Sequence, residues 1–201
     1  MEAVARRELM TLEEWAALPD GVPGEWVDGR LEEEEMASFA HALCVSWLAM
    51  ILGTWLEDRR FVFTSDSKYR VSEARGRKPD LSVCLPGRSL PSRRDSMSSK
   101  PPSIAAEVVT PTPRDQRRDR VEKLGGYAAF GVSWYWILDP ELRTLEILEL
   151  DALGRYAHVV GRSAGQIAPV PGCEGLVVDL DALWARLDAL PSDDVSPGRE
   201  G

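Results

Sequence analysis

The stretch Ile104-Ala105-Ala106-Glu107-Val108-Val109 decides the fold, because it is a nearly continuous apolar run interrupted by a single acid. A short apolar run of this kind is typical of a strand at the centre of a sheet, buried on both faces. An ionised glutamate among buried neighbours is costly unless a cation lies beside it. A divalent metal would supply that cation, and a structural ion pair with an arginine is the alternative explanation.

A second carboxylate, Asp80, follows Lys78-Pro79 at the start of a short segment rich in β-forming residues. On its own, Asp80 would equally be a turn residue at the start of a strand. Magnesium takes its oxygen ligands from one or two carboxylates and completes its octahedron with waters and substrate phosphates. The pairing of Asp80 with Glu107 therefore predicts a metal site.

The segments around these acids predict both helices and strands. Apolar residues three and four apart predict a long helix from Ser38 to about Glu57. Thr112 before Pro113 caps a predicted helix that ends at Gly131. We further expect a short helix opening at Thr11, a hairpin at Asp28-Gly29, strands at 61–63, 67–71, 81–84, 104–109, 134–138, 144–150 and 156–160, and a final helix at 180–190. This order predicts an α/β fold with a mixed β-sheet.

The whole chain fits one compact domain. Its 201 residues are 44% hydrophobic, and we expect one domain over residues 1–190 with a disordered tail over 191–201. No apolar run reaches the length of a membrane span, and the N-terminus lacks the apolar core of a signal peptide, so we expect a cytoplasmic protein with no membrane partner. Three cysteines without a paired motif are expected to be reduced core residues: Cys44, Cys84 and Cys173.

The net charge of -9 argues against a protein that coats nucleic acid with a broad cationic surface. Any DNA substrate must meet a local basic patch, for which the candidates are Arg93, Arg94, Lys100, Arg114, Arg117, Arg118, Arg120 and Lys123. Each of these residues alone would equally belong to a solvated charged face. The Pro-, Ser- and Arg-rich segment 85–102 predicts an irregular, mobile connection beside the site, where it would allow DNA access.

Asp119, Lys123 and Tyr127 are spaced four apart and should share one face of the predicted helix. A lysine projected toward the two carboxylates would orient a metal-bound water and steady the charge that grows on a phosphate. An Asp119 to Lys123 ion pair on the surface is the alternative.

Six short motifs in order carry a family resemblance: Glu25-Trp26-Val27-Asp28-Gly29, His41, Lys78-Pro79-Asp80, the run from Ala106 to Pro111, Lys123 with Tyr127, and the run from Gly131 to Pro140. Over about residues 10 to 160 the sequence resembles the Uma-type family of putative restriction endonucleases. The resemblance implies the restriction-endonuclease-like PD-(D/E)XK fold, a mixed β-sheet flanked by helices, and metal-dependent hydrolysis of DNA. Two positions after Glu107, where that superfamily has lysine, stands Val109.

The resemblance also implies roles for particular residues. Asp80 and Glu107 would hold Mg²⁺ or Mn²⁺, with the Val108 carbonyl as a further ligand and Lys123 in place of the missing strand lysine. Glu25 would be a third acid near the metal, or else an acid on the strand surface. His41 would lie at the edge of the site, although its position near the apolar helix face also suits a core histidine. Arg117, Arg120 and Tyr127 are expected to contact DNA, and nucleases of this fold suggest a homodimer.

Two other functions remain open on the sequence alone. A nuclease-fold binding or assembly module with a degraded site is favoured by Val109 and by the acidic balance. A metal hydrolase of small substrates would suit the acidic surface but leaves the arginine-rich helix start unexplained.

Overall fold

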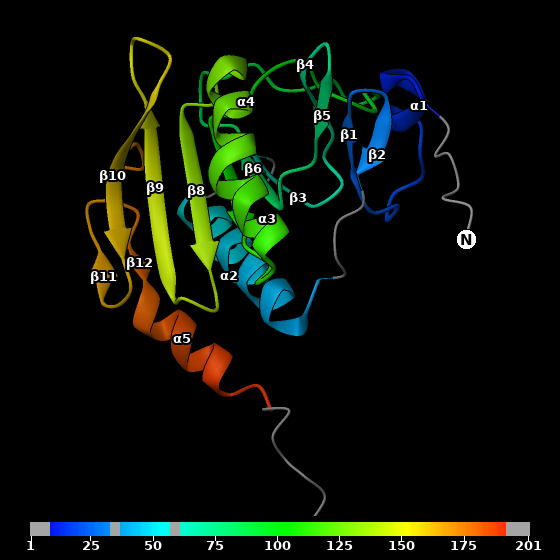
Figure 1. Cartoon of the computed structure of the whole chain (residues 1–201). Helices are drawn as coiled ribbons and strands as arrows, with labels where there is room; N and C mark the ends of the chain where they lie inside the picture. Colours follow the sequence, from blue (N-terminus) through cyan, green and yellow to red (C-terminus); the bar gives the residue numbers. More distant parts are fainter. Residues whose placement is uncertain (1–8, 33–36, 57–60, 192–201) are drawn as a thin grey trace, which may run out of the picture.

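The computed structural model describes residues 9–32, 37–56 and 61–191 and contains a six-stranded sheet in the order β10-β9-β8-β7-β6-β3 (Figure 1). Only β7 and β8 run parallel, and the other neighbours are antiparallel, so the sheet is mixed as predicted. The strands are β3 (Val62–Thr64), β6 (Leu81–Val83), β7 (Ile104–Val108), β8 (Trp134–Asp139), β9 (Thr144–Leu150) and β10 (Tyr156–Arg162).

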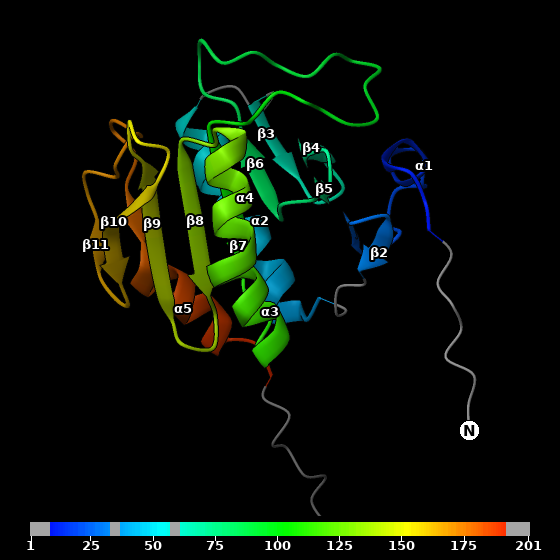
Figure 2. The same ribbon diagram turned by 45° about the horizontal axis from the view of Figure 1, so that its top comes forward.

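Helices cover both faces of this sheet (Figures 1 and 2). Helices α2 (Phe39–Trp55) and α5 (Leu180–Asp188) pack on one face, where buried leucines of both helices meet the central strands. Helices α3 (Pro113–Arg117) and α4 (Lys123–Phe130) lie across the other face, where Tyr127 packs against Tyr135 of β8. The expected α/β architecture with a helix-flanked mixed sheet is confirmed.

Strand β7 is buried along its whole length, as its apolar sequence predicted. Ala106 and Val108 belong to the core under α2, whereas Ala105 and Val109 belong to the core under α4. Because successive side chains of a strand point to opposite faces, Glu107 is directed toward α4.

A second, four-stranded sheet has the order β2-β1-β5-β4. Its strands are β1 (Glu25–Val27), β2 (Arg30–Glu32), β4 (Tyr69–Ser72) and β5 (Arg75–Arg77). The Asp28-Gly29 hairpin joins β1 to β2, and the short helix α1 (Leu12–Ala16) begins with a Thr11 capping box, both as predicted. Strand β5 was not predicted. Its Gly76 passes so close to Trp15 that a Cβ there would lie 2.5 Å from the indole ring.

The predicted helix from Pro113 to Phe130 contains a π-helical turn, Arg118–Glu122, between α3 and α4. The expected boundaries hold, since the Thr112 side chain caps the start and Gly131 ends the helix with a positive φ. A π-turn has wider hydrogen-bonded rings than the α-helix and occurs frequently at functional sites.

The segment 85–102 is irregular as predicted, but the prediction that it lies beside the two carboxylates is wrong. It leaves β6 after Val83 and rejoins the sheet at Ile104, and these two residues are paired at the end of β6 and β7 opposite to Asp80 and Glu107. Asp80 directly precedes β6, whereas the segment 85–102 follows it. The two therefore lie at opposite ends of the paired strands β6 and β7.

Other expectations have simpler outcomes. The three cysteines are buried and unbridged. A two-stranded sheet of β11 (Gln166–Ile167) and β12 (Val178–Asp179), which was not predicted, precedes α5. The predicted disordered tail falls almost wholly on 192–201, outside the described residues. Among the residues described, no helix has the length and apolar character needed to cross a membrane.

Candidate active site

Asp80 and Glu107 lie next to each other at one end of the β6 and β7 pair. Leu81 is paired with Ala106, so Asp80, one residue before β6, adjoins the last residues of β7. Asp80 Oδ2 accepts a hydrogen bond of 2.7 Å from the Val108 backbone N–H. Both carboxylates line one cavity of about 260 Å³. The two acids proposed as metal ligands are therefore brought together.

Several other side chains line this cavity. His41 of α2 approaches Asp80, with its Nε2 3.2 Å from Asp80 Oδ2. Arg118, Lys123 and Lys78 bring positive charge to the same walls. Lys78 Nζ donates to Asp66 Oδ1 at 2.6 Å. The cavity thus combines carboxylates with cations, the combination needed to hold a metal ion and a phosphate.

Lys123 is 1% exposed and lies among three carboxylates. Its Nζ is 3.0 Å from Glu107 Oε2, 3.2 Å from Asp119 Oδ1 and 3.6 Å from Glu25 Oε1. Tyr127, one helical turn later, donates a 2.7 Å hydrogen bond to Glu107 Oε1. The predicted shared face of the helix is confirmed, and the alternative of an Asp119 to Lys123 pair on the surface is wrong.

Burial raises the pKa of Glu107 well above its usual value. Lys123 lowers this pKa, but Asp80, Asp119 and Glu25 raise it further. One buried lysine therefore does not compensate the acids gathered around Glu107, and another cation would favour its ionised form.

Glu25 does not belong to the described lining of the cavity. Its carboxylate accepts hydrogen bonds from Arg77 Nη1 at 2.6 Å and from the Lys78 backbone N–H at 2.9 Å. Burial raises the Glu25 pKa, but Lys123, Arg77 and the Lys78 N–H lower it more, so the net pKa lies below its usual value. Glu25 is thus a buried anion beside Lys123, outside the described lining of the cavity, and is not an acid on the strand surface.

The charges of this cluster do not balance. Beside the Lys78 and Asp66 pair it holds five acids, namely Glu25, Asp80, Glu107, Asp115 and Asp119, and four cations, namely Arg77, Arg114, Arg118 and Lys123. Taken with every carboxylate ionised, the excess is one negative charge. A metal cation beside Asp80 and Glu107 would offset that excess.

The donor set also suits a metal ion. Within the described ranges, no three His, Cys, Asp or Glu side chains converge as a complete metal cage. The donors are the pair Asp80 and Glu107, with the backbone of Val108 on the same cavity wall. Magnesium is commonly bound through one or two carboxylates while it keeps several waters. The residues therefore fit magnesium or manganese, with open positions for waters and a phosphate.

The structure places the three predicted DNA contacts away from the cavity lining, so far as that lining is described. Arg117 is exposed and pairs with Glu122 at 3.2 Å. Arg120 pairs with Asp139 at 2.9 Å and also with Glu146. Tyr127 is buried against Glu107. Contact of these residues with DNA stays a prediction, whereas His41 does line the cavity.

Sequence reasoning did not assign a site role to Arg77 or Lys78, and it placed Arg118 only in the candidate basic patch for DNA. The triplet Arg75-Gly76-Arg77 has no apolar alternation, so nothing indicated a strand or a buried arginine. Arg118 was interpreted as one of several surface arginines, yet it is 9% exposed and its Nη1 lies 2.9 Å from the buried Asp115. Of these three residues, only Lys78 lay in a motif of the family resemblance, because it precedes Pro79-Asp80.

Comparisons with known proteins agree with this site. Residues 9–181 match the family described as "Uma2: Putative restriction endonuclease". The crystal structure of a putative nuclease belonging to DUF820 from Anabaena variabilis is similar, with a TM-score of 0.69 and 17% identity over 89% of this chain and 99% of that chain. No curated protein matches the sequence. Family and fold point to a restriction-endonuclease-like nuclease, and the match over residues 9–181 shows that the chain belongs to the Uma2 family of putative restriction endonucleases.

Proposed function

We propose that the protein is a divalent-metal-dependent DNA endonuclease whose metal ligands are Asp80, Glu107 and the Val108 carbonyl. The observation that carries the proposal is that Asp80 and Glu107 line one small cavity while the buried Lys123 lies 3.0 Å from Glu107. Two carboxylates and a cation in one recess are what metal-assisted phosphodiester hydrolysis requires. The family supplies the substrate class, which is DNA.

A bound Mg²⁺ or Mn²⁺ would polarise the phosphate, lower the pKa of a bound water and stabilise the leaving oxygen. The protein holds its two acids in fixed orientations. Tyr127 holds Glu107 Oε1, and His41 with the Val108 N–H holds Asp80 Oδ2. Such outer partners orient metal ligands and raise metal affinity.

The cations of the cavity act on the substrate. Lys78 and Arg118 line its walls and would attract the phosphodiester. Lys123 would orient the attacking water and stabilise the negative charge that grows on the phosphate oxygens. In the reaction, the water oxygen bonds to phosphorus, the bond from phosphorus to the leaving oxygen breaks, and that oxygen takes up a proton.

Two copies of this site in a homodimer would allow two DNA strands to be cut. We infer this dimer from the fold alone, and light scattering of the purified protein would test it. The same preparation would test the proposal that residues 1–190 form one domain, because a single cooperative unfolding transition is expected.

The test of the nuclease proposal is a calorimetric titration of magnesium and manganese followed by plasmid nicking on the same samples. Asp80→Asn keeps the shape of the acceptor for the Val108 N–H but removes the charge. Asp95→Asn, on an exposed residue of the 85–102 segment, is the matched control. We expect metal binding and nicking in the wild type and the control, and the loss of both in Asp80→Asn.

The competing function is a binding or assembly module that keeps the fold without cleavage. The ion pair between Lys123 and Glu107 favours it, because part of the Glu107 charge is already compensated. In such a module the wild type would bind no divalent metal, and Glu107→Gln would stabilise the fold without the loss of any activity. Either result would remove the support for the nuclease proposal.

A further inference from the structure

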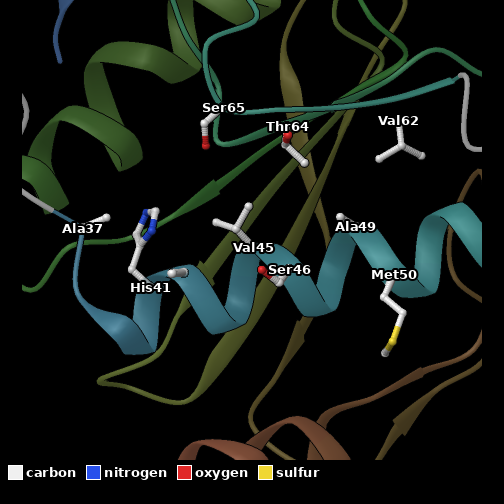
Figure 3. A pocket seen from close by; sticks show the side chains of 10 residues that line it. Ala37, His41, Val45, Ser46, Ala49, Met50, Val62, Thr64 and Ser65 are labelled. Atoms are coloured by element: carbon white, nitrogen blue, oxygen red, sulfur yellow. The ribbon is translucent and has the colours of Figure 1, made fainter. Parts of the chain in front are cut away.

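A groove of about 600 Å³ runs from the cavity along the outer side of α2, between that helix and β3. Figure 3 shows His41 and Val45 rising from α2 toward Thr64 and Ser65. Ala37, His41 and Ser65 line both the groove and the cavity. The two spaces therefore adjoin at these three residues.

The two spaces differ in charge. The cavity is lined by Lys78, Arg118 and Lys123 as well as by its carboxylates. The described lining of the groove contains no Lys, Arg, Asp or Glu. A sugar-phosphate backbone needs cations along its path. The described part of the groove therefore offers an uncharged surface, which suits the uncharged part of a nucleotide whose phosphate lies in the cavity.

The groove also presents the right contacts for a nucleobase. Val45 and Met50 offer apolar surface, while Ser46, Thr64 and Ser65 carry hydroxyls that both donate and accept hydrogen bonds. Hydroxyl side chains hydrogen-bond to any of the bases, so the groove would hold a base without selecting one. Its volume lies within the range of roughly 300–1,000 Å³ found for organic ligands in protein sites.

Glu107 and Lys123 lie deep in the recess, since their side chains are 3% and 1% exposed, whereas that of Asp80 is 21% exposed. A phosphodiester must enter that recess to reach them. A base that lies in the adjoining groove cannot at the same time be stacked and paired in a duplex. A strand held in this way needs an unpaired nucleotide beside the cavity.

We propose that this groove binds the unpaired nucleoside next to the scissile phosphate, so that the substrate class is DNA with unpaired nucleotides. The proposal rests on the proposed nuclease function, because it takes the cavity as the place of the phosphate. The nucleoside contacts the face of α2 that carries Val45 and Ser46, and the phosphate lies beside Asp80.

The test measures the affinity of fluorescent 12-nucleotide probes by anisotropy, in calcium, which binds oxygen ligands. The probes are single-stranded oligothymidine, a 12-unit strand with abasic sugars, and a duplex of oligothymidine with oligoadenine. Ser46→Trp fills the groove from an exposed helix position, and Thr54→Trp, exposed on the same helix outside the groove lining, is the matched control. Magnesium calorimetry on each variant reports the cavity separately.

We expect the wild type and Thr54→Trp to bind oligothymidine about tenfold more tightly than the abasic strand, because the groove offers a base apolar surface and hydroxyl hydrogen bonds. In Ser46→Trp this preference should vanish, while abasic binding and magnesium binding stay unchanged. The inference is overturned if Ser46→Trp keeps the preference, if the wild type shows none, or if the duplex binds more tightly than the single strand. A preference that persists without magnesium binding or plasmid nicking would contradict the nuclease proposal but not the nucleoside site.

Discussion

Lys123 Nζ lies 3.0 Å from Glu107 Oε2, although the lysine belongs to α4 and the glutamate to β7. In the superfamily that the sequence resembles, a lysine is expected two residues after the acid, on the same strand. Here Val109 holds that position and is buried in the apolar core under α4. The cation reaches the carboxylate from the helix instead, so in the proposed site Lys123 takes the place of a strand lysine.

Replacement of this lysine should abolish cleavage while metal binding persists. In Lys123→Met the ligands Asp80 and Glu107 remain, but the charge beside the phosphate is lost, and we expect plasmid nicking to fall by about a hundredfold or more. Removing one partner of a buried ion pair should also lower the free energy of unfolding by about 3 kcal/mol. Nicking rates, calorimetry and urea unfolding measure the three effects.

The matched control is Lys100→Met, because Lys100 is exposed and its Nζ donates to the Leu90 carbonyl. It should nick at the wild-type rate. Wild-type nicking by Lys123→Met would show that the lysine is only structural.

The central strand and the helix faces could be predicted because their patterns are local. The apolar run around Glu107 indicated a buried strand, and the four-residue spacing of Asp119, Lys123 and Tyr127 indicated one face. The meeting of Asp80 with Glu107 depends on the antiparallel register of β6 and β7, which no local pattern records. The prediction therefore relied on the chemistry of the two acids and on the resemblance.

The remainder of the site could not be predicted because it lies between elements with weak signals. Glu25 is followed by Trp26 and Val27 in a three-residue strand, a pattern that suits an exposed or a buried acid equally. Its partner Arg77 lies on β5, which has no apolar residue at all. The burial of both residues follows from the packing of the small sheet against the large one, and composition did not reveal it.

The pair formed by Glu25 and Arg77 should show strong coupling in a double-mutant cycle. Arg77→Met leaves a buried carboxylate with one fewer cation and should cost about 3 kcal/mol of unfolding free energy or more. Glu25→Gln combined with Arg77→Met removes both charges and should cost less than the sum of the single variants. Urea unfolding of the four proteins measures the coupling, and additive losses would show that the ion pair contributes nothing.

Stability should depend on pH through Glu25. Lys123, Arg77 and the Lys78 N–H outweigh burial and hold the Glu25 pKa below its ordinary value of 4.5. A carboxyl group whose pKa is lower in the folded state stabilises the fold above the unfolded pKa, and this contribution is lost as the pH falls through the folded pKa. The difference in unfolding free energy between wild type and Glu25→Gln should therefore be largest above about pH 4.5 and shrink in more acidic solution. Unfolding series from pH 3 to 7 test this, and a difference that grows toward acid pH would contradict it.

His41 should act through Asp80. Its Nε2 lies 3.2 Å from Asp80 Oδ2, an arrangement that fixes the orientation of the carboxylate. We expect His41→Ala to weaken magnesium binding by about tenfold, the lower end of the effect of an outer partner on a metal site. Thr54→Ala on the same helix is the control, and calorimetry gives both affinities. Unchanged magnesium affinity in His41→Ala would show that the histidine lines the cavity without orienting Asp80.

The π-helical turn should determine the register between the two halves of the long helix. Arg118 and Asp119 lie in this turn and Lys123 directly follows it. All three residues line the cavity. Val121 lies inside the turn with 64% of its surface exposed, so its side chain contributes little to packing. Insertion of an alanine after Val121 should rotate one half of the helix by about 100° against the other, because each α-helical residue turns the chain by that angle. Lys123 and Tyr127 would then lose Glu107, or Arg118 and Asp119 would leave the cavity.

For this insertion we expect nicking to fall by about a hundredfold or more, because one of these sets must be displaced, and we expect a lower melting temperature because the displaced charges are buried. Val121→Ala changes the same turn without a change of register and should alter the unfolding free energy by no more than about 0.5 kcal/mol. Nicking rates and thermal unfolding of the two variants show whether the helix register matters. An insertion variant that nicks at the wild-type rate would show that the sheet, and not the helix register, sets the position of Lys123.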